Sequence, residues 1–101
     1  MDKGPKTNDN GPMAVAKHVV YRGRVQGVGF RYTAKEAAQE FAVSGYVRNL
    51  PSGEVEVTVE GEESVVDAFL DQIASRMAGC IKDVNTKPVP PTGYREFQIR
   101  Y

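Results

Sequence analysis

The chain has 101 residues, of which 41% are apolar, and its 13 basic and 13 acidic side chains leave no formal net charge at pH 7. This length fits a single domain with a modest core, and the balanced charge argues against non-specific binding to nucleic acid or to an anionic membrane. The lone cysteine, Cys80, excludes an internal disulfide, and no apolar run approaches the ~20 residues of a membrane helix.

The first 16 residues are rich in Gly, Pro, Asn, Asp and Lys and contain almost nothing that a core would bury. We expect residues 1–16 to form a disordered tail and residues 17–101 to form the domain. Met13 is an alternative start of the functional chain, and the sequence does not decide between the two starts.

The first half of the domain predicts a strand, a helix and a second strand. Residues 18–25 alternate between apolar and polar side chains, which is typical of a strand with one buried face. After a glycine-rich stretch, alanines recur at helical spacing, and we expect Gly45 to follow this helix as its C′ residue. Residues 46–50 then predict a short strand, and residues 51–53 predict a turn.

The second half begins with the regular alternation EVEVTVE, residues 54–60, which predicts a strand with valines inside and a solvated face of glutamates. A helix over residues 62–78, a weaker strand over 80–87 and a last strand over 97–101 follow. The order β-α-β-β-α-β-β predicts a ferredoxin-like α+β sandwich with an extra C-terminal strand, in which two helices cover one face of an antiparallel sheet.

The stretch GRVQGVGFR, residues 23–31, has the composition of an anion-binding loop. Gly27 and Gly29 allow successive backbone N–H groups to turn inward and form a concave nest, and the helix that follows directs its positive end to the same place. The guanidinium of Arg31 has the planar fork that binds two phosphate oxygens. These letters alone leave a second interpretation open, in which the glycines relieve strain in a structural turn and Arg31 is solvated.

Three familiar phosphate-binding loops do not match this stretch. No Gly-Lys-Ser/Thr occurs, Tyr32 occupies the place of the third glycine of a dinucleotide fingerprint, and Val25 occupies the place of a phosphatase cysteine. What remains is an anion cradle without a covalent nucleophile.

Two segments together resemble the signatures of the acylphosphatase family. Residues 23–31 are similar to the pattern G-x-V-Q-G-V-x-F-R. GYVRNLPSGEVEVTVEG, residues 45–61, is similar to G-[aromatic]-V-x-N-x-x-x-G-x-V followed, after five further residues, by another glycine. The resemblance covers residues 17–101. Tyr21 and Ser52 depart from the usual pattern at structural positions, whereas Gly29 replaces a larger residue of some members and bears on substrate preference.

The resemblance implies hydrolysis of the carboxyl-phosphate bond of a small acyl phosphate, with no metal and no cofactor. It implies that Arg31 binds the phosphoryl group and that Asn49 orients the attacking water, and that phosphate or sulfate occupies the same site. The backbone cradle would consist of the N–H groups of Gln26, Gly27, Val28, Gly29 and Phe30.

Three other functions are alternatives to this one. An RNA-binding module needs aromatic side chains on its central strands, and the glutamates of residues 54–60 would repel a phosphate backbone. A domain of a larger carbamoyl-phosphate-handling enzyme is disfavoured by the chain end at Tyr101. The third is an acylphosphatase fold without hydrolytic activity, and an assay of phosphate release distinguishes it from an active enzyme.

The remaining conspicuous side chains have ordinary interpretations. We expect His18 to be a surface residue at the edge of the first strand and Cys80 to be a small packing residue. We expect a cytoplasmic monomer with no nucleic-acid or membrane partner.

Overall fold

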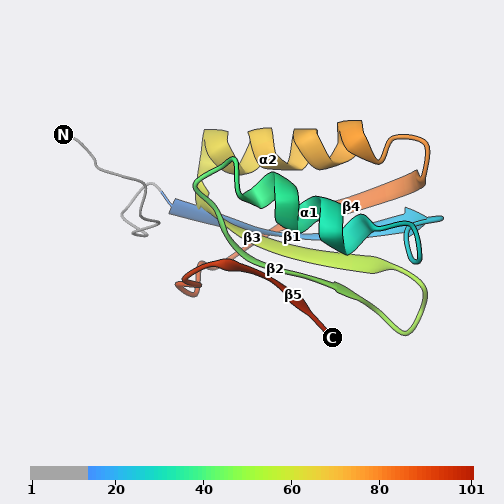
Figure 1. The fold of residues 1–101 in the computed structure, drawn as a ribbon. Helices are drawn as coiled ribbons and strands as arrows, with labels where there is room; N and C mark the ends of the chain where they lie inside the picture. The colour runs from blue at the N-terminus through green and yellow to red at the C-terminus, as the bar shows by residue number, and fades with distance from the viewer. Residues whose placement is uncertain (1–13) are drawn as a thin grey trace.

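A computed structural model, which describes residues 14–101, has the predicted order of elements. Two helices lie on one face of a five-stranded sheet whose strand order is β4-β1-β3-β2-β5 (Figure 1). The ferredoxin-like α+β class is therefore confirmed. The elements are β1 (Ala14–Gly23), α1 (Phe30–Ala38), β2 (Ser44–Asn49), β3 (Val55–Glu62), α2 (Glu63–Arg76), β4 (Ile81–Val89) and β5 (Phe97–Arg100).

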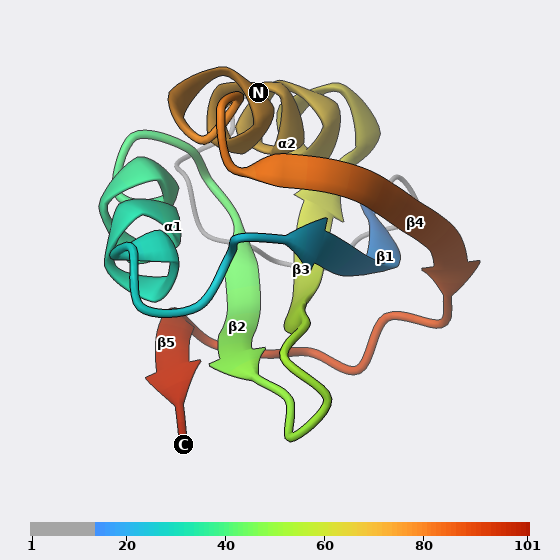
Figure 2. The same cartoon turned by 90° about the vertical axis from the view of Figure 1, so that its right-hand side faces the viewer.

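The sheet differs from the prediction at its last strand. The pairs β1–β3, β1–β4 and β2–β3 are antiparallel, but β5 runs parallel to β2, so the sheet is mixed. Because β4 and β5 lie at opposite edges, the connection over residues 90–96 has to cross from one side of the sheet to the other (Figure 2). This crossing returns the chain to the edge beside β2, where it runs in the same direction as that strand.

The domain begins earlier than expected. Strand β1 starts at Ala14, and Ala16 is buried and pairs with Glu60 of β3, so residues 14–16 belong to the sheet. The remainder of the predicted tail, residues 1–13 with Met13, lies outside the described residues. Neither helix within residues 14–101 is long and apolar enough to cross a bilayer.

The hydrophobic core lies between the sheet and the helices, on the face that the alternation predicted. Val19, Val57 and Val47 lie opposite one another across three neighbouring strands and are buried beneath the helices. Burial of an aliphatic side chain of this size stabilises the fold by about 1.5–3 kcal/mol. Around them pack Tyr21, Val25, Phe30, Ala34, Ala37, Val55, Val59, Val66, Phe69, Ile73 and Met77.

Gly45 does not cap the first helix, as the sequence suggested. Helix α1 ends at Ala38, and Gly45 is the second residue of β2, with φ of +140°. A Cβ atom at this position would lie 1.9 Å from the carbonyl oxygen of Thr58 on β3. A glycine is therefore required here because the backbones of β2 and β3 approach each other too closely for any side chain.

The face of β3 away from the helices is not the solvated row of glutamates that we expected. Glu56, Thr58 and Glu60 are all buried. Glu56 lies between His18 Nε2 and Arg48 Nε, each 2.7 Å from one of its oxygens, so His18 is a partner of this carboxylate rather than an isolated surface residue. Burial raises the pKa of Glu56, but the hydrogen bonds from His18 and Arg48 outweigh it and leave the pKa below its ordinary value.

We predict that Glu56→Gln lowers the free energy of unfolding at pH 7 by about 1–3 kcal/mol, because hydrogen bonds to a charged group are lost. The pKa of Glu56 is lower in the folded protein, so its contribution is present above the unfolded-state pKa and is lost as the pH falls through the folded-state pKa. Urea unfolding at pH 7 and at about pH 3 measures both values. The difference between variant and wild type should shrink at the lower pH, and Glu62→Gln, at an exposed residue of the same strand, serves as the control. An equal difference at both pH values would contradict the assignment.

Candidate active site

The loop between β1 and α1 has the backbone conformation that its glycines allow. Gly27 and Gly29 have φ of +76° and +80°, in the left-handed region that side chains rarely adopt. A Cβ atom at either position would meet nothing within 4 Å, so the requirement is conformational and not one of space. Gly29 precedes α1 as its N-cap, and its carbonyl accepts a hydrogen bond of 2.9 Å from the N–H of Thr33.

Arg31 and Asn49 lie at one small cavity. Arg31 belongs to the first turn of α1, and Asn49 is the last residue of β2, where that strand leaves the sheet. The loop before α1 and the C-terminal end of β5 lie at the same end of the domain (Figures 1 and 2). The cavity has a volume of about 160 Å³ and is lined by Val25, Gly27, Gly29, Phe30, Arg31, Tyr32, Asn49, Ile99 and Tyr101.

The cavity carries positive charge and free hydrogen-bond donors. Within residues 14–101, Arg31 makes no ion pair, and its guanidinium carbon lies 5.0 Å from the centre of the Tyr101 ring. The backbone N–H groups of residues 26–30 donate no hydrogen bond to any group within residues 14–101. Unpaired amides at a helix N-terminus, next to an arginine, are suited to bind an anion.

Gln26 and Val28, whose backbone N–H groups we expected in the cradle, are not among the residues that line the cavity. Nε2 of Gln26 donates to the carbonyl oxygens of Leu50 and Glu54, at 2.8 and 2.9 Å. These two carbonyls belong to the β2–β3 turn that directly follows Asn49, so Gln26 attaches the loop to the segment that carries Asn49. This role of its side chain was missed, since the motif named only its backbone; Val28 packs against the core.

The apolar side of the cavity was also missed. Ile99 and Tyr101 come from the C-terminal end of the chain, and Tyr32 follows Arg31 on α1. The alternation of residues 97–101 indicated a strand but not its partner. Only the pairing of β5 with β2 brings Ile99 and Tyr101 to Arg31.

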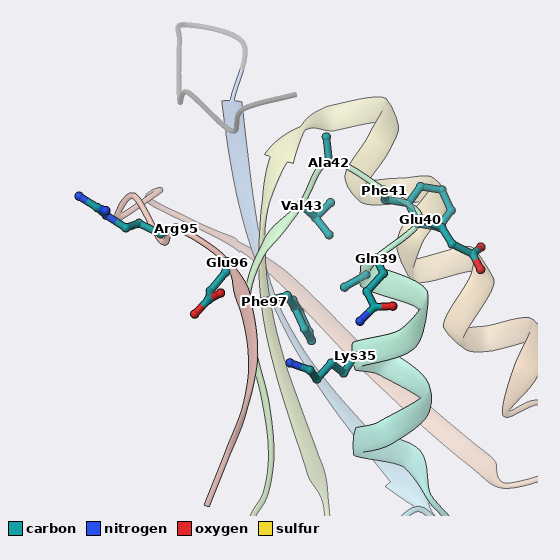
Figure 3. Close-up of a pocket in the computed structure, with 10 residues that line it drawn as sticks. Lys35, Gln39, Glu40, Phe41, Ala42, Val43, Arg95, Glu96 and Phe97 are labelled. Carbon is teal, nitrogen blue, oxygen red and sulfur yellow. The ribbon is translucent and has the colours of Figure 1, made fainter. Parts of the chain in front are cut away.

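A larger hollow of about 680 Å³ lies at the other end of α1. Figure 3 shows Lys35 and Gln39 directed toward Phe97, whereas Glu40 and Arg95 point away from this space. The C-terminal end of α1 faces this region, and its carbonyl dipoles disfavour an anion. The smaller cavity at the N-terminal end of the helix is therefore the better phosphate site.

The fold is that of an α+β protein whose glycine-rich loop and Arg31 are suited to bind an anion. The model of the acylphosphatase family matches residues 17–99. An acylphosphatase of Methanospirillum hungatei is 38% identical over 84 residues, which cover 81% of this chain and 92% of that protein. The crystal structure of acylphosphatase from Bacillus subtilis is similar with a TM-score of 0.77 and 28% identity, covering 86% of this chain and 99% of that one.

A match of a different kind is HypF from T. kodakarensis, with a TM-score of 0.72 and 36% identity over 84% of this chain but only 11% of that longer one. The family model and the relatives that match over most of their length identify the same family. The chain belongs to the acylphosphatase family, and it is an enzyme that hydrolyses acyl phosphates. Within residues 14–101 no three His, Cys, Asp or Glu side chains are grouped so that they would hold a metal ion, and the use of no metal stays a prediction.

We predict that Gln26→Ala lowers the free energy of unfolding by about 1–2 kcal/mol, because two hydrogen bonds to backbone carbonyls are lost. Inorganic phosphate should also inhibit this variant less strongly, since the loop is no longer attached to the turn after Asn49. Urea unfolding and an inhibition titration measure the two effects. Gln39→Ala, at an exposed residue, is the control, and a Gln26→Ala protein with unchanged stability would show that the two bonds are unimportant.

Proposed function

We propose that Arg31 and the backbone N–H groups of residues 26–30 bind the phosphoryl group of an acyl phosphate, and that Asn49 positions the attacking water. The observation that carries this proposal is the shared cavity: Arg31 and Asn49 line it together with two glycines in the left-handed conformation. Inorganic phosphate, a product, and sulfate, its analogue, would occupy the same cradle.

The chemistry of the substrate explains why so few side chains suffice. An acyl phosphate is a mixed anhydride, and its leaving group is a carboxylate that departs without a proton from a general acid. The water oxygen bonds to phosphorus as the bond from phosphorus to the acyl oxygen breaks, and the electron pair leaves with the carboxylate. Such an in-line displacement requires mainly positioning and stabilisation of charge.

Arg31 and the loop amides supply the charge stabilisation. The guanidinium presents its donors in a planar fork that matches two phosphate oxygens, and the amides belong to a backbone that needs no rearrangement during the reaction. Val25 and Phe30 are buried and form an apolar lining, next to which these interactions are stronger than in water.

Asn49 has a different task. Its side-chain amide accepts a hydrogen bond and donates two, so it can hold a water in line with the phosphorus, but it is too weakly basic to take a proton from that water. We infer that an oxygen of the substrate's own phosphoryl group accepts the proton. This assignment gives Arg31 and Asn49 separable effects on kinetics.

We predict that Arg31→Gln raises KM and lowers kcat, whereas Asn49→Ala lowers kcat by about 100–1000-fold with a smaller change in KM, as expected for loss of one group that acts in the transition state. Release of phosphate from acetyl or benzoyl phosphate measures both parameters. Arg95→Gln makes the same substitution at an exposed arginine that does not line this cavity, and it should behave as wild type.

Two results would contradict the proposal. Full turnover by a folded Asn49→Ala protein would exclude its role toward water. Unchanged inhibition of Arg31→Gln by inorganic phosphate would exclude Arg31 from the phosphoryl site.

A further inference from the structure

The cavity has a second surface that the phosphoryl group would not occupy. Tyr32 and Tyr101 are 68% and 96% exposed, yet both line the cavity beside Arg31, together with the half-buried Ile99. If the phosphoryl group binds at Arg31, as we propose above, the acyl part of the substrate extends from it toward these three side chains. We call Tyr32, Ile99 and Tyr101 the acyl wall.

Two of the three residues of the acyl wall depend on the position of β5. This strand has four residues and lies at the edge of the sheet, and within residues 14–101 its one partner strand is β2. So short an edge strand needs support from outside its own ladder, because few hydrogen bonds determine its register. That support has to come through the connection over residues 90–96.

Glu60 holds this connection. Its side chain is 0% exposed, and its carboxylate accepts hydrogen bonds from the backbone N–H groups of Thr92, Gly93 and Tyr94 and from the hydroxyl of Thr92. Oε1 lies 3.0 Å from the N–H nitrogen of Gly93 and 3.2 Å from that of Tyr94. A carboxylate accepts at both oxygens and donates at neither, so it matches a set of groups that all donate.

Aromatic and cation–π contacts link the connection over residues 90–96 to β5. The Tyr94 ring meets the Tyr46 ring edge-on with centroids 5.9 Å apart, and the guanidinium of Arg100 lies 4.3 Å from the Tyr46 ring centre and 5.6 Å from that of Tyr94. Arg100 is the last residue of β5 and directly precedes Tyr101. A further hydrogen bond of 3.0 Å joins the N–H of Gly45 to the carbonyl of Glu96, where β5 begins.

We propose that Glu60 is a positioning residue for the acyl wall: its buried carboxylate holds residues 92–94 so that β5 places Ile99 and Tyr101 against the acyl group of the substrate. Glu60 itself touches no reacting atom, since it lies on β3 and is not among the residues that line the cavity. Its influence falls on the recognition of the acyl group and leaves the contacts of the phosphoryl group in place.

Glu60→Gln tests this proposal, because the amide nitrogen of glutamine adds a donor among groups that already donate. We expect KM for benzoyl phosphate to rise by about two- to tenfold relative to KM for acetyl phosphate, the range that one aromatic contact contributes. Inhibition by inorganic phosphate, which has no acyl part, should change less than KM for benzoyl phosphate. Glu62→Gln is the matched control, with the same substitution at an exposed position of the same strand.

Tyr101→Ala completes a double-mutant cycle. Tyr101→Ala alone should shift the ratio of the two KM values in the same direction. Adding Glu60→Gln to it should change the ratio less than Glu60→Gln does alone, because Ile99 is then the remaining residue of the acyl wall that β5 positions. Additive effects, or an unchanged ratio in a folded Glu60→Gln protein, would overturn the proposal. If Glu60→Gln does not fold, Arg100→Met interrupts the same path at an exposed residue, and an unchanged ratio there would overturn it as well.

These outcomes are distinguishable from a failure of the proposed function. If Arg31→Gln turns over substrate at the wild-type rate, the assignment of the phosphoryl site itself is refuted. If Arg31→Gln loses activity but Glu60→Gln leaves the ratio of the two KM values unchanged, only the positioning role is refuted.

Discussion

The burial of β3 on both of its faces is the constraint on which the rest of the structure depends. Its valines face the helices, while Glu56 and Glu60 are buried on the opposite face. A buried carboxylate is unfavourable unless hydrogen-bond donors surround it. The donors come from β1, β2 and the connection to β5, so satisfying these two glutamates requires three separate segments to meet at one strand.

The same strand organises the site. Gln26 donates a hydrogen bond to the carbonyl oxygen of Glu54, directly before β3, and so attaches the glycine-rich loop to the turn that follows Asn49. Arg31 and Asn49, 18 residues apart in the chain, are thereby held by a shared set of hydrogen bonds. The mechanism that we propose uses no covalent nucleophile, so in it the rate depends on the placement of charge and water and therefore on such positioning.

The sequence was sufficient to predict the features that local physics determines. The alternation of Val55, Val57 and Val59 predicted a strand with its valines inside. Gly27 and Gly29 predicted a tightly turning loop, and both have a positive φ. In contrast, alternation tells which side chains share a face but not what covers that face. Glu60 therefore looked solvated, although a connection more than 30 residues away encloses it.

Pairing between distant strands was equally beyond local reasoning. The parallel alignment of β5 with β2 depends on where the chain crosses the sheet, and nothing in residues 97–101 encodes it locally. The contribution of Tyr101 to the cavity went unpredicted for this reason. Gly45 was misassigned because a glycine after a helix suggests a cap, whereas its requirement comes from the backbone of Thr58 on another strand.

The placement of β4 and β5 at the two edges of the sheet has a consequence for behaviour in concentrated solution. An exposed edge is a template on which another chain can add a strand. Here β5 offers only four residues, and β4 carries Lys82, Asp83, Lys87 and Pro88 along its exposed length. The charged side chains and Pro88, which has no backbone N–H group, oppose the addition of a further strand to β4, and β5 is too short to pair strongly. Both edge strands therefore disfavour association of the protein into fibres.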